Sequence, residues 1–375
     1  MKKIVFELQP CCAKRSGIGL YAYELARRMR DTDELSFCGQ IFNFLGRNDN
    51  SSFFNGVQMP IHESRLIPYG IYRRIWNALP IPHEVFSGVR ADLSVFFNYI
   101  VPPRLSGKVI DTICDMTYLR FPETMNARNF DRITAGIATS VEKSAKIVTI
   151  SEFSKQEIIE LLQLPKEMIS VVPCAPSLAS ESADFESVKA RYGISKPFIL
   201  YVGTIEPRKN LIRLIHAFDR LKIEEGIEHL LVLAGGPGWR NEEIYLAAQQ
   251  ASCKEDIRFV GYITAEEKNA FYQHASVLAF PSLYEGFGMP PLEAMTWDCP
   301  VVCANAASIP EVVGEAARLV DPKNEVDIAQ GIWDVLSNPD YADNLITRGR
   351  IQVKKYTWDE SAEKLLRVCR EVLEK

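Results

Sequence analysis

The sequence of 375 residues contains no uninterrupted apolar stretch approaching the roughly 20 residues that a membrane-spanning helix needs. Its first residues include a lysine pair but reach Glu7 and Gln9 too soon for the apolar core of a secretory signal peptide. We interpret this start as the first strand of the fold. Without an export signal or a membrane span, the sequence predicts a cytoplasmic protein.

The sequence has only five histidines, and its cysteines form no cluster that could bind a metal in their place. Cys11–Cys12 and the pair Cys299 and Cys303 are the close spacings among nine cysteines. Neither has the second pair of cysteines or histidines that would complete a zinc site. The cysteines are therefore predicted to be free and mostly buried thiols in a reducing compartment, and no metal site is expected.

The net charge of −5 is unevenly distributed. Residues 1–180 carry an excess of three positive charges, whereas residues 181–375 carry an excess of eight negative charges. Such a balance argues against nucleic acid as the partner, because nucleic-acid-binding domains concentrate basic residues. It does allow the N-terminal half to contact an anionic surface.

Short apolar runs alternate with helical patterns along the whole chain. Strands are predicted in the first half over residues 4–8, 93–97, 109–114, 145–150 and 169–172, with helices over 19–30 and 155–162. Strands are predicted in the second half over residues 198–202, 230–233, 257–260, 277–280, 301–303 and 318–320. This alternation is typical of α/β proteins with parallel sheets covered by helices on both faces, and two blocks predict two Rossmann-like domains.

Domain boundaries follow from a polar, small-residue-rich stretch over residues 177–186 that shows no periodicity. The sequence predicts an N-terminal domain over residues 1–180 and a C-terminal domain over residues 187–357. Residues 358–375 form an amphipathic pattern and are predicted to be a helix.

The most informative segment is PSLYEGFGMPPLEA, residues 281–294. It follows a predicted buried strand and combines a glycine loop with two prolines that open a helix. The free amides and positive dipole of such a helix start favour an anion. Glu285 and Glu293 flank that position, so the segment suits a ligand with a phosphate in the middle and hydroxyl-rich groups at both ends, as in a nucleotide sugar.

This segment resembles the E-x7-E signature of the retaining glycosyltransferases of family 4, which have the GT-B fold. YVGTIEPRKN (residues 201–210) resembles the family's diphosphate-binding loop, and GIGLY (residues 17–21) its N-terminal glycine loop. VTISEFSK (residues 148–155) resembles a strand end that faces between the domains. The resemblance extends over essentially the whole chain. It implies that the N-terminal domain binds the acceptor, the C-terminal domain binds the nucleotide sugar, and the last helix packs back on the first domain.

Arg208 and Lys209 follow a predicted strand and a proline-stiffened turn. Fixed cations there would stabilise the negative charge of a leaving diphosphate, although a solvated basic turn is the alternative for these residues taken alone. Glu293 could accept hydrogen bonds from a ribose diol or complement the helix dipole. The resemblance places Glu285 beside the transferred sugar. Candidate catalytic residues are Glu285, Arg208, Lys209 and Asp115; candidate donor-binding residues are Gly17, Gly19, Gly203, Thr204, Arg208, Lys209, Tyr262, Glu285, Phe287, Gly288, Met289, Pro290, Leu292 and Glu293.

Two positions depart from the family pattern. Cys114 stands where relatives usually carry a histidine that touches the donor sugar, and Asp115 follows it. Residues 172–175 read VPCA where relatives usually have Pro-Asn-Gly. Asp31-Thr32-Asp33 matches the D-x-D metal motif of another glycosyltransferase fold, but its setting at the end of a basic helix favours a solvated turn.

The resemblance implies a retaining glycosyltransferase that moves a hexose to a hydroxyl of a lipid-linked or polysaccharide acceptor. The loops at residues 203–210 and 235–239 are most similar to those of mannosyltransferases that build bacterial O-antigen or capsule chains, which favours GDP-mannose as donor. Because the sequence offers no metal cluster, Arg208 and Lys209 are expected to neutralise the leaving diphosphate in a metal-independent reaction. A sugar-nucleotide epimerase or hydrolase on the same fold, and a non-catalytic assembly scaffold, are the alternatives.

Residues 65–76, RLIPYGIYRRIW, mix cations with aromatic and aliphatic side chains. This composition suits a peripheral contact with the inner membrane leaflet. An ordinary amphipathic segment packing on its own domain explains it equally well, so both interpretations stay open from the sequence.

Overall fold

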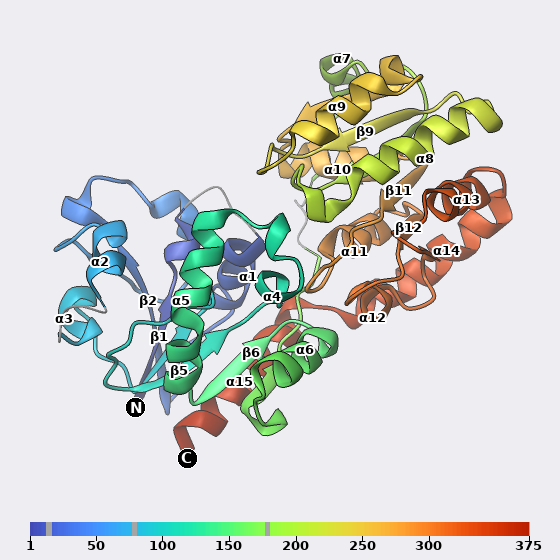
Figure 1. Ribbon diagram of the computed structural model, residues 1–375. Coiled ribbons are helices and arrows are strands. Elements are labelled where there is room, and N and C mark those ends of the chain that lie inside the picture. Colours follow the sequence, from blue (N-terminus) through green and yellow to red (C-terminus); the bar gives the residue numbers. More distant parts are fainter. Residues whose placement is uncertain (13–16, 77–80, 177–180, 375) are drawn as a thin grey trace. The chain divides into compact units, whose positions relative to one another are not determined.

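The computed structural model describes residues 1–12, 17–76, 81–176 and 181–374, and it divides into two compact units (Figure 1). Unit 1 comprises Met1–Tyr118, Ala127–Cys174 and Thr357–Lys375. Unit 2 comprises Leu119–Asn126 and Ala175–Tyr356. Both are α/β units with all-parallel sheets, which confirms the predicted fold class.

The sheet of unit 1 has seven strands in the order β3-β2-β1-β4-β5-β6-β7. Their bounds are β1 Lys2–Glu7, β2 Leu35–Phe42, β3 Ile61–Ser64, β4 Leu93–Phe96, β5 Lys108–Thr112, β6 Lys146–Thr149 and β7 Ile169–Val171. The helices of this part of the chain are α1 Gly17–Ala26, α2 Tyr69–Ile75, α3 His83–Ser87, α4 Thr117–Arg120, α5 Ala127–Lys143, α6 Glu152–Leu162 and α15 Trp358–Glu374. Strands β2, β4, β5 and β6 are almost entirely buried, and burial of their aliphatic side chains contributes to the core.

The C-terminal helix α15 belongs to unit 1 and packs on α1 and β5. The rings of Tyr21 and Trp358 lie 6.0 Å apart, and the Ser361 hydroxyl donates to the Pro173 carbonyl at 2.8 Å. The strongly amphipathic sequence of this helix explains the contact, because its apolar stripe must be covered.

The sheet of unit 2 has six strands in the order β10-β9-β8-β11-β12-β13. Their bounds are β8 Phe198–Val202, β9 Leu230–Ala234, β10 Ile257–Gly261, β11 Val277–Phe280, β12 Val301–Ala304 and β13 Arg318–Val320. The helices are α7 Phe185–Tyr192, α8 Leu211–Glu224, α9 Glu242–Gln250, α10 Ala265–His274, α11 Met289–Thr296, α12 Ile309–Val313, α13 Glu325–Leu336 and α14 Pro339–Gln352.

The sequence predicted every strand of the unit 2 sheet but missed β2 and β3 of unit 1. Strand β3, with the sequence IHES, is too polar and short to stand out, and β2 carries Gly39 and Gln40 in its interior. The predicted linker ends too late, because α7 begins at Phe185 and Asp184 caps it. Residues 177–180 of that linker lie outside the described residues.

The segment 65–76 contains α2, and its aromatic side chains pack inward. Tyr72 is 2 % exposed, its ring lies 4.9 Å from that of Phe42, and its hydroxyl is 2.7 Å from His83 Nδ1. Leu66 and Ile71 remain exposed. Tyr72 thus belongs to the core of unit 1, whereas Tyr69 and Trp76 are partly buried. Among the described residues, none of the helices combines the length and apolarity required to cross a bilayer.

Glycines hold the carboxyl ends of β8, β9 and β10 close together. The Gly203 amide donates to the Ala234 carbonyl, and the Gly235 amide donates to the Gly261 carbonyl. A Cβ atom on Gly235 would lie 1.8 Å from the Gly203 carbonyl oxygen, so no other residue fits that position without movement of the backbone. This close approach positions the loop that follows β8.

We expect Gly235→Ala to destabilise the protein by roughly 1–3 kcal/mol or more, because the added methyl group overlaps the Gly203 carbonyl. Denaturant unfolding measures the loss. Gly236→Ala is the matched control, since a methyl group added there would have no atom within 4 Å. Equal stabilities of the two variants would contradict this explanation.

Candidate functional site

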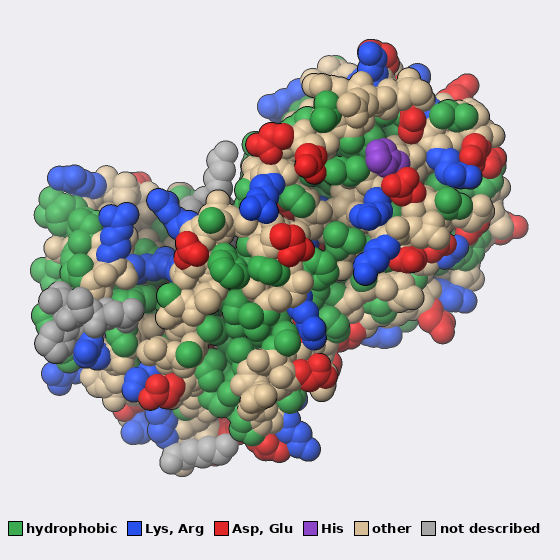
Figure 2. All heavy atoms as spheres, in the orientation of Figure 1, with side chains coloured by type: hydrophobic (Ala, Val, Ile, Leu, Met, Phe, Trp, Pro, Cys, Tyr) green, Lys and Arg blue, Asp and Glu red, His purple; other side chains and the backbone are tan. Residues whose placement is uncertain are grey.

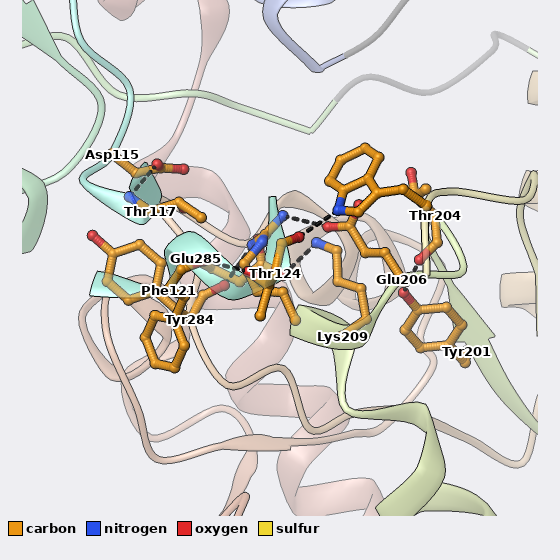
Figure 3. A network of polar contacts seen from close by, with 12 residues as sticks. Asp115, Thr117, Phe121, Thr124, Tyr201, Thr204, Glu206, Lys209, Tyr284 and Glu285 are labelled. Carbon is orange, nitrogen blue, oxygen red and sulfur yellow. Dashed lines mark hydrogen bonds and ion pairs between the residues drawn. The ribbon is translucent and has the colours of Figure 1, made fainter. Parts of the chain in front are cut away.

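Two cations that follow β8 meet one carboxylate that follows β11. Arg208 and Lys209 lie in the short turn Pro207–Lys209, and Glu285 lies in the loop before α11. The Glu285 carboxylate is 3.0 Å from Arg208 Nη1 and 2.5 Å from Lys209 Nζ. Figure 3 shows the Lys209 and Glu285 side chains pointing toward one another. Because β8 and β11 are neighbours in the sheet, their carboxyl ends bring these loops together.

The electrostatics of this cluster follow from its burial. Burial alone would raise the pKa of Glu285, but the Lys209 ammonium and the Arg208 guanidinium lower it to about 2. Burial, together with the neighbouring Arg208 charge, lowers the pKa of Lys209. Glu285 is therefore ionised at neutral pH and compensates the two cations.

A second carboxylate, Glu206, completes the cluster, and it was not among the residues predicted from the sequence. Glu206 is 2 % exposed and accepts a hydrogen bond from Arg208 Nη2 at 2.9 Å. The Tyr284 carbonyl accepts a further bond from Arg208 Nη1. The sequence did contain a signal for Glu206, which stands two residues before Arg208. A buried guanidinium needs acceptors for its N–H donors, and a nearby carboxylate can supply one.

Backbone contacts fix the two loops relative to each other. Asn210 has a left-handed backbone with φ of 62°, and its side-chain amide donates to the carbonyls of Pro281 at 3.0 Å and Pro322 at 2.6 Å. The Leu283 amide donates to the Arg208 carbonyl at 2.9 Å. Asn210 tolerates this conformation better than most residues, and it ties the loops after β8, β11 and β13 to one another.

The glycine loop ends at Gly288, whose φ of 96° is accessible mainly to glycine, and α11 begins at Met289. Pro290, Pro291 and Leu292 occupy the first turn, as predicted for a helix start with prolines. Phe287 is buried, and its ring packs 5.4 Å from that of Tyr356.

Glu293 lies inside α11 and is 4 % exposed. One of its oxygens is 2.6 Å from Lys268 Nζ, and the other accepts a hydrogen bond from the Tyr272 hydroxyl at 3.0 Å. The structure therefore gives each of the two signature glutamates a cationic partner from another element. Arg208 and Glu285 are themselves in direct contact.

Several predicted residues lie near strand ends without joining the ion cluster. Gly203 and the exposed Thr204 follow β8, and Tyr262, which is 63 % exposed, follows β10. Gly17 and Gly19 lie in the first turn of α1 rather than in a loop.

In unit 1, Asp115 has a local structural role. Its Oδ1 accepts hydrogen bonds from the amide of Thr117, the first residue of α4, at 2.9 Å and from the Tyr99 hydroxyl at 3.2 Å. The neighbouring Cys114 is buried, and burial raises the pKa of its thiol. Cys114 is accordingly a thiol at neutral pH and not a reactive thiolate.

The segment Leu119–Asn126 belongs to unit 2, which the sequence did not predict. Phe121 packs 5.4 Å from Tyr284, the residue before Glu285. The Trp239 indole donates to the Thr124 carbonyl, and Arg240 donates to the Glu123 carbonyl. This segment therefore packs against the loop that carries Glu285.

Across the described ranges of the chain, no group of three or more histidine, cysteine, aspartate or glutamate side chains is arranged to hold a metal. The D-x-D match at residues 31–33 forms a turn. Asp31 accepts from the Phe37 amide at 2.8 Å, and Thr32 accepts from the Leu35 amide at 3.0 Å.

Comparisons with known proteins agree on the family. The model of the family described as glycosyl transferases group 1 matches residues 184–352. The O-antigen chain mannosyltransferase B of Escherichia coli is 29 % identical over 95 % of this chain and 96 % of its own. The O-antigen chain mannosyltransferase RfbU of Salmonella typhimurium is 25 % identical over 68 % of this chain and 67 % of its own.

The crystal structure of HepE from Anabaena in complex with UDP and glucose matches with a TM-score of 0.75. It is 14 % identical and covers 99 % of this chain and 100 % of its own. At that identity the match shows the fold alone, which is the GT-B fold. Two parallel sheets, a glycine loop leading into α11 and the match over residues 184–352 make the chain similar to the glycosyl transferases of group 1.

Proposed function

We propose that the protein is a retaining mannosyltransferase that uses GDP-mannose and adds the sugar to a hydroxyl of a lipid-linked or polysaccharide acceptor in bacterial surface glycan synthesis. The observation that carries this proposal is the buried cluster of Arg208, Lys209 and Glu285 beside the start of α11. Unit 2 would bind the donor and unit 1 the acceptor. The mannosyltransferases among the relatives support the choice of sugar.

In this proposal, the donor diphosphate replaces Glu285 as the anionic partner of Arg208 and Lys209. Arg208 and Lys209 would then hold the phosphate oxygens, and the charge that accumulates as the glycosidic bond breaks would be stabilised by groups already in place. Glu285, released from the cations, would accept hydrogen bonds from the hexose hydroxyls. The amides of Phe287, Gly288 and Met289 would approach the sugar and phosphate.

The remaining candidate residues would fix the ends of the donor. Glu293, oriented by Lys268 and Tyr272, would accept the ribose hydroxyls, and Tyr262 would lie near the base. Gly203 and Thr204 would contact the diphosphate. For unit 1 we propose that Gly17 and Gly19 contact the donor phosphate and that Asp115 contacts the sugar.

The anomeric configuration of the transferred sugar would be retained because the acceptor hydroxyl attacks on the face from which the diphosphate leaves. A phosphate oxygen of the leaving group would take the proton of the acceptor. Such a reaction depends on positioning and charge stabilisation more than on a protein base.

GDP should bind more tightly than UDP. Transfer from GDP-mannose should continue in EDTA, because Arg208 and Lys209 would neutralise the leaving group. Calorimetry and a transfer assay measure these two results. A clear preference for UDP would contradict the donor assignment. Loss of activity on chelation, restored by magnesium, would contradict the role of the two cations. Release of free mannose without an acceptor would identify a hydrolase instead.

Arg208→Ala and Glu285→Ala should change GDP binding in different ways, although both lower kcat. Arg208→Ala should weaken GDP binding and lower kcat, because a cation is lost from both ground and transition states. Glu285→Ala should leave GDP binding as tight as before or tighter, since the anion that competes for the cations is gone. Its kcat should fall by on the order of a hundredfold, as when one preorganised polar contact is removed.

Asp298→Ala is the control for these two variants, because it removes an exposed ion pair with Arg350 elsewhere in unit 2. Calorimetry and steady-state kinetics on all three proteins separate binding from turnover. Loss of GDP binding in Glu285→Ala, with the turnover of bound donor unchanged, would refute the assignment.

We also propose that unit 1 touches the inner face of the cytoplasmic membrane through Leu66 and Ile71, which are 69 % and 49 % exposed beside Arg65 and Arg74. Replacing both apolar residues by aspartate should reduce co-sedimentation with anionic vesicles, because apolar insertion and charge attraction are both weakened. Ile351→Asp, at a 62 % exposed position of unit 2, is the control. Equal sedimentation of the wild type and both variants would exclude this surface.

A further inference from the structure

The loop between β11 and α11, residues 281–288, carries Glu285 and two glycines. In the described structure, ion pairs with Arg208 and Lys209 hold the Glu285 carboxylate. In the proposed reaction the donor diphosphate binds these two cations, so Glu285 loses both partners when the donor arrives. Other contacts must then keep the loop in place, because a loop with two glycines has little stiffness of its own.

Contacts on both sides of the Glu285 carboxylate do not depend on its ion pairs. The Ser308 hydroxyl donates to the Glu285 carbonyl at 2.8 Å. Tyr284, the preceding residue, is 3 % exposed, and its ring packs against that of Phe121 with a centroid distance of 5.4 Å and an interplanar angle of 43°. Figure 3 shows these two rings beside each other at one side of the ion cluster. Phe121 thus contacts the residue next to the carboxylate.

Phe121 belongs to the segment Leu119–Asn126, which lies in unit 2 although the chain before and after it belongs to unit 1. It precedes the short helical turn Pro122–Thr124. The hydroxyl and the amide of Thr124 both donate to the Phe121 carbonyl, at 2.8 and 3.0 Å. The backbone of Phe121 is therefore fixed by the turn that follows it, and the ring meets Tyr284 from a defined position.

The loop after β9 anchors the same segment. Trp239 Nε1 donates to the Thr124 carbonyl, and Arg240 Nη1 donates to the Glu123 carbonyl. Arg240 has a left-handed backbone with φ of 51°, a conformation that persists in a residue other than glycine where surrounding contacts fix it. Strand β8 lies between β9 and β11 in the sheet. The segment therefore joins the loops on both sides of the strand that precedes Arg208.

We propose that Phe121 is a positioning residue, which holds Glu285 against the transferred hexose once the donor has displaced the ion pairs. It acts through Tyr284 and does not itself touch the reacting atoms. Ring packing suits this role, because it has a defined geometry and does not compete with phosphate for the cations. The inference rests on the proposed function and deepens it, since it gives a role in the transfer to a residue outside the signature loops.

Phe121→Ala should lower kcat by roughly tenfold, because a loop that moves misplaces the Glu285 carboxylate. GDP affinity should stay within about twofold of the wild type, since Arg208 keeps its bond to Glu206. Calorimetry with GDP and steady-state kinetics with GDP-mannose measure the two quantities. A loss of GDP affinity as large as the loss of kcat would overturn the proposal.

Two further variants control for changes in the segment itself. Phe121→Tyr keeps the ring and should restore most of kcat. Leu119→Ala should behave as the wild type, because Leu119 lies in the same segment and is 45 % exposed. Figure 2 shows hydrophobic side chains at the surface over the region where Figure 1 places α4, the helix that contains Leu119. A kcat as low in Leu119→Ala as in Phe121→Ala would contradict a specific role of the ring.

A double-mutant cycle tests whether Phe121 acts through Glu285. In the Glu285→Ala background, Phe121→Ala should cause no further loss of kcat, because the carboxylate that it positions is gone. An equal loss in both backgrounds would indicate general destabilisation and overturn the positioning role.

Hydrogen exchange supplies a readout that needs neither transfer nor nucleotide. In Glu285→Ala the ion pairs are absent, so adding Phe121→Ala should speed exchange of the amides of residues 284–288 by roughly tenfold. Exchange in β9 should stay unchanged, which separates local release from unfolding. Unchanged exchange in residues 284–288 would overturn the proposal. If the wild type transfers no hexose, the proposed function fails, and the exchange result alone decides whether Phe121 holds the loop.

Discussion

The ion cluster of Arg208, Lys209 and Glu285 is the interaction on which the candidate donor site depends. Each group is largely removed from water, and a buried charge without a partner is strongly destabilising. The cluster therefore joins the loop after β8 to the loop after β11. The backbone bond from Leu283 to Arg208 and the two bonds from Asn210 hold the same loops, so the charges meet in one fixed geometry.

The remainder of unit 2 supports that geometry. Its parallel sheet places the loops after β8, β9 and β11 on one edge, and the contact between Gly235 and Gly203 sets the path of the backbone toward Arg208. Phe121 packs on Tyr284 from a segment that is distant in the sequence. The site is thus built from backbone contacts between strand ends, which explains why its polar side chains lie on short loops with little freedom.

The sequence by itself determined the α/β class, the strands of unit 2 and the identity of the signature loops, because buried strands and glycine–proline helix starts leave local patterns. Only the tertiary structure decided that Arg208 and Glu285 touch, that Glu206 belongs to their cluster and that Leu119–Asn126 packs in unit 2. Local patterns reflect the backbone of one segment, whereas these contacts arise from the order of strands in a sheet, which no single segment encodes.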